Sequence, residues 1–172
     1  GVFIRHFGGW LRTRRYCEGE LSDPEKELLD TLGEGFLYHI EAGLNPVKSY
    51  KMVVILTILD LHGTEWKIET IAKGFLDYFL SHPDRMVDYP DLAKEENPDE
   101  FSIKRVVTHL KKMPLNYLSN TEKDFFVLDA ENGIFRLKPE IIPYWKVDFF
   151  RSLVRERVAY VLARYFSRKQ AR

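Results

Sequence analysis

The fold class follows from FSIKRVVTHLKKMPLNYLSNTEKDFFVLDAENGIFRLK, which spans residues 101–138. Ser102 is a favourable N-cap and the apolar residues after it recur at helical spacing, so a helix is predicted over 102–113. Two short apolar runs then flank a connection that ends in Asn-Gly, which is the pattern of a β-hairpin. The segment therefore predicts an amphipathic helix followed by hairpin strands at 125–128 and 134–137.

The predicted 102–113 helix has a polar side that is basic and carries no acid. The residues expected on that side are Lys104, Arg105, Thr108, His109, Lys111 and Lys112. A helix directly before a hairpin occupies the place of the recognition helix in a winged helix, and in helix-turn-helix relatives such a helix lies in the major groove of DNA. The hairpin would be the wing, and its expected phosphate contacts are Lys123, Arg136 and Lys138.

The residues upstream complete the same order of elements. A helix is predicted over 47–61, apolar nearly all round and therefore buried, followed by a short extended piece at 65–68 and a further helix. Residues 82–100 contain three prolines and many acids, so we expect a mobile loop or insertion there. Helix, strand, helix, loop, helix and hairpin is the order of a winged helix, which we predict for 47–138.

Helices flank this domain on both sides in the sequence. Ser22 and Glu25 form a capping-box pattern at the start of the first helix. A long amphipathic helix is predicted over 143–168. We therefore expect a mainly α protein with a small β-hairpin, in which an N-terminal helical segment (1–46) and a C-terminal helical segment (139–172) accompany the winged-helix-like domain.

Composition restricts the class of protein. Apolar residues are 45% and charged residues 30% of the 172 positions, as in folded globular domains. The single cysteine excludes an intramolecular disulfide framework and a cysteine-based zinc site, and it favours a cytoplasmic location. No apolar run is long enough to span a membrane, so no membrane partner is expected. The chain begins at Gly1, and we expect it to belong to a longer polypeptide.

The charges are segregated although 26 basic and 26 acidic residues give a net charge of zero. Basic residues gather in 1–16, 102–113 and 146–172, and acidic residues gather in 18–41 and 84–100. If the basic segments share one side of the fold, they would attract a polyanion such as DNA. The alternative is that they pair with the acidic segments.

The most distinctive motif is KSYKM at 48–52, which an aliphatic run follows. It is preceded by Trp10 in GGWLR and by Glu20-Leu21, and RYFSRK lies at 164–169. In this order the motifs resemble the C-terminal regions of large bacterial superfamily II (DEAD/DEAH-type) helicases of restriction and phage-defence systems. The resemblance implies an accessory domain beside a helicase motor. The sequence has no P-loop, so ATP hydrolysis is not implied for this segment.

The residues of KSYKM have two local interpretations. Ser49 is expected to cap the 47–61 helix, with Tyr50 anchored through its hydroxyl. Alternatively, Lys48, Ser49 and Lys51 bind a phosphate at the helix N-terminus. The local pattern favours capping.

No pattern in the sequence predicts catalysis. Glu65 and Lys67 would suit a metal-dependent nuclease, but the Pro-Asp pairs that would supply a second carboxylate follow them instead of preceding them. The five histidines lack metal-ligand spacing, so neither a metal nor a cofactor is expected.

We therefore predict a non-catalytic nucleic-acid-binding accessory domain of a larger DNA-processing or defence enzyme, with duplex DNA favoured over single strands. The main alternative is a docking module that binds a helicase or nuclease subunit through the 143–168 helix. A metal-dependent nuclease is the least favoured interpretation.

Overall fold

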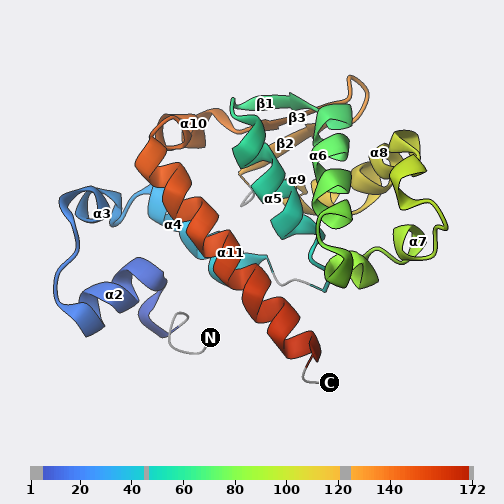
Figure 1. Cartoon of the computed structure of the whole chain (residues 1–172). Helices are drawn as coiled ribbons and strands as arrows, with labels where there is room; N and C mark the ends of the chain where they lie inside the picture. The colour runs from blue at the N-terminus through green and yellow to red at the C-terminus, as the bar shows by residue number, and fades with distance from the viewer. Residues whose placement is uncertain (1–5, 45–46, 121–124, 171–172) are drawn as a thin grey trace. The chain divides into compact units, whose positions relative to one another are not determined.

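The structure, a computed structural model, describes residues 6–44, 47–120 and 125–170 and is mainly helical with a small antiparallel sheet (Figure 1). The chain forms two compact units. Unit 1 joins Gly1–Val47 to Pro139–Arg172, and unit 2 is Lys48–Lys138. The two ends of the chain, predicted as separate segments, thus belong to one unit. Across the described ranges, no helix has both the length and the apolar character needed to cross a membrane.

Unit 2 contains the predicted helix and hairpin. Its elements in chain order are α5 (Tyr50–Leu61), β1 (Glu65–Lys67), α6 (Ile68–Leu80), η2 (Pro83–Asp88), α7 (Pro90–Ala93), η3 (Pro98–Glu100), α8 (Ile103–Lys112), α9 (Pro114–Ser119), β2 (Phe126–Asp129) and β3 (Ile134–Leu137). The sheet has the order β1-β3-β2 and is antiparallel throughout, with Trp66 of β1 opposite Phe135 of β3. The predicted extended piece at 65–68 is therefore the third strand of the hairpin sheet.

The helix α5 is buried on nearly every side, as its apolar sequence predicts. The chain leaves this helix through His62 and Gly63, both at positive φ. Glycine adopts that backbone conformation without steric cost, so Gly63 lets the chain turn directly into β1.

Residues 82–100 differ from the predicted mobile loop. They form η2, α7 and η3, and Asp88, Tyr89 and Leu92 are buried. The carboxylate of Asp88 accepts a hydrogen bond from the backbone N–H of Ser49 at 2.9 Å. The backbone carbonyl of Asp88 accepts a second hydrogen bond, from the Tyr50 hydroxyl. The segment is therefore held in place by buried residues, Asp88, Tyr89 and Leu92, which its proline-rich and acidic composition did not indicate.

The close approach of α6 to α5 depends on Gly74. A Cβ atom added at Gly74 would lie 2.6 Å from Cγ2 of Thr57, a side chain that is itself buried. We expect Gly74→Ala to lower the free energy of unfolding by about 1–2 kcal/mol, because overpacking outweighs the better helix propensity of alanine. Urea unfolding would measure the change.

The matched background for this substitution is Thr57→Ser, which removes the methyl group that the new Cβ would meet. In that background Gly74→Ala should be neutral or stabilising, by up to about 1 kcal/mol. An equal loss in both backgrounds would show that the methyl contact is not the cause.

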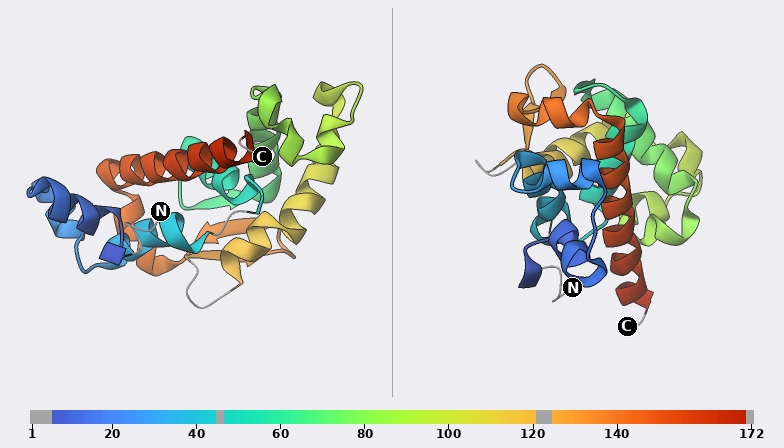
Figure 2. Two further views of the ribbon diagram at one scale, coloured as in Figure 1. Left: turned by 90° about the horizontal axis from the view of Figure 1, so that it is seen from below. Right: turned by 90° about the vertical axis from the view of Figure 1, so that its left-hand side faces the viewer.

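Unit 1 is built from helices at both ends of the chain. They are α2 (Trp10–Glu18), α3 (Asp23–Leu28), α4 (Leu32–Tyr38), the π-helix η1 (His39–Gly43), η4 (Pro139–Ile141), α10 (Ile142–Trp145) and α11 (Asp148–Gln170). The long helix α11 is continuous and packs against α4 and η1 (Figure 2). Phe36 of α4 contacts Trp145 and Phe150, with ring centroids 6.0 and 5.9 Å away.

Two predicted helices of unit 1 are interrupted. The capping box of Ser22 and Glu25 is confirmed at the start of α3, but the helix ends at Leu28 and α4 begins after Asp30, which has a φ of 62°. The Thr31 hydroxyl caps α4 by accepting from the Glu34 N–H. The predicted 143–168 helix is likewise divided into α10 and α11, with the break at 146–147.

Candidate nucleic-acid interface

The helix α8 exposes one basic face. Its side chains Val106 and Leu110 are buried, whereas Lys104, Arg105, Thr108 and Lys112 are exposed and Lys111 is half-buried. Helical spacing places these last five residues on one side, across about three turns. We call them the α8 face: Lys104, Arg105, Thr108, Lys111 and Lys112.

The α8 face lies beside the turn of the hairpin. The Lys111 ammonium donates a hydrogen bond to the Ala130 carbonyl, between β2 and β3, at 2.8 Å. Lys104 and Lys112 form no ion pair with any residue that the structure describes. Two cations of this face are therefore available to an anionic ligand.

Arg105 is oriented by two neighbours. Its guanidinium lies 4.3 Å from the ring centroid of Phe101 and 3.1 Å from the Glu95 carboxylate. A cation over an aromatic face and beside a carboxylate loses freedom of orientation. Of the four cations on the α8 face, Arg105 is thus the one with a carboxylate partner in the described residues.

The prediction that His109 faces a ligand is wrong. Its ring stacks on Tyr89 at 4.9 Å and meets Tyr50 edge-on at 4.7 Å, inside an aromatic cluster. Burial lowers the pKa of His109, and its buried Nε2 has no hydrogen-bond partner among the residues that the structure describes. Position 109 lies at the boundary between the polar and apolar sides of α8, and the sequence analysis placed it on the polar side because histidine is a polar residue.

A cluster of aromatic rings packs against α8 through His109. It consists of Tyr50, Phe75, Phe79, Tyr89, Phe101 and His109. Burial raises the pKa of Tyr50, and it raises that of Tyr89 to about 12, so both phenols are neutral near pH 7. This cluster was not predicted as a unit, because its residues come from separate parts of the sequence, namely α5, α6, the junction of η2 with α7, and the segment from Phe101 to α8.

Both interpretations of Ser49 are wrong. The residue is fully buried, so it cannot contact a phosphate, and its side chain makes no cap to α5. Its backbone N–H donates a hydrogen bond to Asp88, and its hydroxyl has no hydrogen-bond partner in the described part of the chain. The anchoring of Tyr50 by its hydroxyl is confirmed. Lys48 and Lys51 are half-buried on either side of this pair.

The part of the hairpin that the structure describes does not present a basic surface. Arg136 is exposed on β3, but it lies opposite Glu65 with Nη1 and Oε2 4.0 Å apart. The same outer sheet face also carries Lys67 and Asp129, so its charges balance. Lys138 is half-buried after β3, and Lys123 lies outside the described residues.

The residues considered for a nuclease do not form a metal site. Glu65 and Lys67 are exposed on β1 with Trp66 buried between them. Within 6–44, 47–120 and 125–170, no three His, Cys, Asp or Glu side chains are placed to bind a metal ion together.

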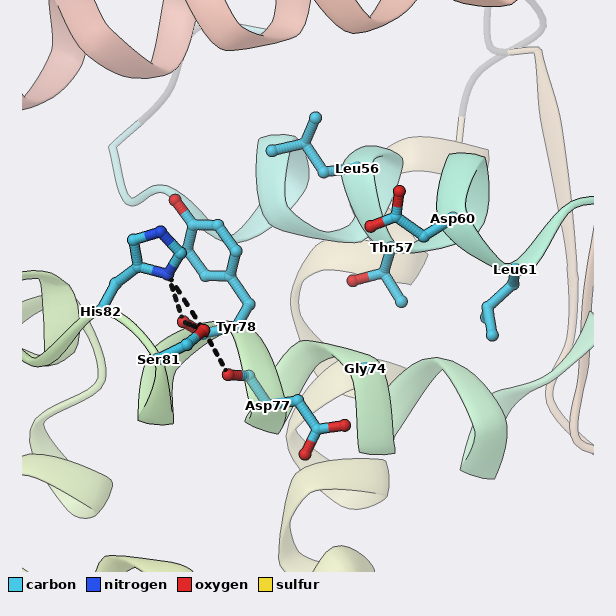
Figure 3. A pocket seen from close by; sticks show the side chains of 9 residues that line it. All are labelled: Leu56, Thr57, Asp60, Leu61, Gly74, Asp77, Tyr78, Ser81 and His82. Carbon is cyan, nitrogen blue, oxygen red and sulfur yellow. Dashed lines mark hydrogen bonds between the residues drawn. The ribbon is translucent and has the colours of Figure 1, made fainter.

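A cleft that the sequence did not predict lies between α5 and α6 (Figure 3). It has a volume of about 400 Å³, and it is lined by Leu56, Thr57, Asp60, Leu61, Gly74, Asp77, Tyr78, Ser81 and His82. His82 Nδ1 is hydrogen-bonded to the Tyr78 carbonyl at 2.7 Å. The lining contains two carboxylates and neither Lys nor Arg, so the cleft does not suit a phosphate.

Comparison with protein-family models, with curated proteins and with solved structures finds no match to this chain. The resemblance to the C-terminal regions of superfamily II helicases stays a prediction.

Proposed function

We propose that unit 2 is a winged-helix-like module that binds nucleic acid, with α8 as its recognition helix. The observation that carries this proposal is the α8 face: four cations and no acid on a helix whose opposite side is buried. A rigid helix with this charge pattern suits the groove and phosphates of a duplex.

The position of the hairpin turn supports the same function. The contact of Lys111 with Ala130 keeps the turn beside the C-terminal end of α8. Because the outer sheet face has balanced charges, the hairpin would contribute backbone and shape contacts, and α8 would supply most of the phosphate neutralisation.

Duplex DNA is the favoured ligand. The α8 face contains no aromatic side chain, whereas proteins that bind single strands stack bases on aromatic rings. The module would act as a non-catalytic accessory part of a larger DNA-processing enzyme, as the helicase resemblance implies. Docking through α11 has less support, because Leu153, Val154, Val158, Val161 and Leu162 are buried and Tyr160 is its one exposed large apolar residue in the described range.

Fluorescence anisotropy with a labelled duplex across a salt series tests this function. Lys104→Ala/Lys112→Ala should weaken binding roughly 10- to 50-fold near 0.1 M salt and reduce the slope of log affinity against log salt by about 2, because two phosphate contacts are lost. The control is Lys73→Ala/Lys146→Ala, which removes the same charge from exposed positions elsewhere. No binding at low salt, or equal losses in both variants, would contradict the proposal.

A further inference from the structure

An acidic segment is fixed next to the α8 face. We call residues 91–100 the acidic strap; it holds five acids and one base, Lys94. Leu92 is buried within the strap, and Tyr89 and Phe101 are buried on either side of it. These anchors keep the strap in place beside α8.

One acid of the strap reaches Arg105. The Glu95 carboxylate lies 3.1 Å from Nη1 of Arg105, and the two side chains are 37% and 54% exposed. Phe101 packs under the same guanidinium. An ion pair this exposed is weak, so a phosphate in the same place can displace the carboxylate.

We propose that Glu95 competes with nucleic-acid phosphate for Arg105 and thereby weakens binding at the α8 face, an inference that rests on the proposed function. In the free protein Glu95 accepts a hydrogen bond from Nη1 of Arg105. In the complex the displaced carboxylate stays close to the phosphates, because the strap is anchored on both sides, and the like charges repel. The acidic strap therefore lowers affinity most at low salt, where the repulsion between Glu95 and phosphate is least screened.

The ion pair between Glu95 and Arg105 is not needed to keep the acidic strap folded against α8. Asp88, Tyr89 and Leu92 are fully or almost fully buried and bind this region through hydrogen bonds and aromatic packing that do not involve Glu95. A neutral, isosteric side chain at position 95 should therefore leave the fold intact, which thermal unfolding followed by circular dichroism would check.

The test is the affinity of a labelled duplex for the full chain with Glu95→Gln. We expect binding about two- to five-fold tighter at low salt, the range for release of an exposed ion pair. The matched control is Glu96→Gln, which removes the same charge from the next residue, an exposed one without an ion pair in the described part of the chain. The increase in duplex affinity should be smaller for Glu96→Gln than for Glu95→Gln. In an Arg105→Ala background, the gain from Glu95→Gln should fall to that of Glu96→Gln, because only the general repulsion between carboxylate and phosphate is left.

The possible outcomes separate the two proposals. If neither the natural chain nor any variant binds duplex at low salt, the proposed function fails. If the natural chain binds and Glu95→Gln matches it or matches Glu96→Gln, the role of Glu95 is overturned while the function stands. A gain of undiminished size in the Arg105→Ala background overturns it as well, because the effect would not act through Arg105.

Discussion

Asp88→Ala should lower the free energy of unfolding of unit 2 by about 3 kcal/mol, because it leaves the buried backbone N–H of Ser49 without its acceptor. The carboxylate is fully buried and accepts the Ser49 N–H at 2.9 Å. Alanine offers no acceptor, and water cannot reach the freed N–H without opening the packing around Tyr50. The loss should therefore exceed that of an ordinary surface substitution.

Two further variants make this test specific, with urea unfolding as the measurement. Asp88→Asn keeps an oxygen acceptor for Ser49 and should cost about 1 kcal/mol. Asp84→Ala lies four residues earlier, where the carboxylate is 69% exposed and 3.8 Å from Arg85, and it should change stability by less than about 0.5 kcal/mol. Equal costs at positions 84 and 88 would show that the segment is not anchored.

The same substitution should also affect binding. Tyr89, next to Asp88, stacks on His109 from α8, so loosening this anchor frees α8, the helix for which we propose duplex binding. Asp88→Ala should therefore reduce duplex affinity although it changes no residue of the α8 face.

The stability of unit 1 should fall by about 3 kcal/mol between pH 4.5 and pH 8 through the titration of Glu41 alone. The side chain of Glu41 is 1% exposed in η1. Burial raises its pKa to about 7, although the Trp10 N–H at 2.9 Å and the Arg157 guanidinium favour the charged form. Nη1 of Arg157 lies 3.8 Å from Oε1 of Glu41. The guanidinium carbon of Arg157 lies 4.1 Å from the centroid of the Trp10 ring.

The sign follows from proton uptake. The folded state holds a proton on Glu41 over a pH range in which the unfolded chain, with the ordinary value of 4.5, has released it. Stability is therefore greatest below pH 4.5 for this group and is lost as pH rises through 7. His109 in unit 2 acts in the opposite direction, because burial lowers its pKa and stability is lost as pH falls. The pH profile of the whole chain mixes both effects.

Glu41→Gln isolates the contribution of Glu41. Glutamine can still accept from the Trp10 N–H but does not ionise, so the difference in unfolding free energy between the natural chain and the variant should shift by about 3 kcal/mol from pH 4.5 to pH 8. Urea unfolding at both pH values measures this difference. A difference that is the same at both would show that the buried carboxyl does not titrate in this window.

Elements with a local signal were predictable from the sequence. The helix α8 and the strands β2 and β3 lie within a residue or two of their predicted ranges, because their N-cap, periodicity and Asn-Gly turn act within a few residues of chain. The burial of α5 and the capping box of α3 were predictable for the same reason. The basic character of the α8 face also follows from spacing alone, apart from His109.

Contacts between distant residues required the tertiary structure. Asp88 meets Ser49 across 39 positions, and Glu41 meets Trp10 across 31, and no periodicity or motif marks either carboxylate as buried. The ion pair of Glu95 with Arg105 depends on how the acidic strap is anchored, and the pairing of β1 with β3 joins the two sides of unit 2. Local sequence sets the conformation of a short segment, whereas the burial of a charge depends on which other segments surround it, and only the folded chain determines that.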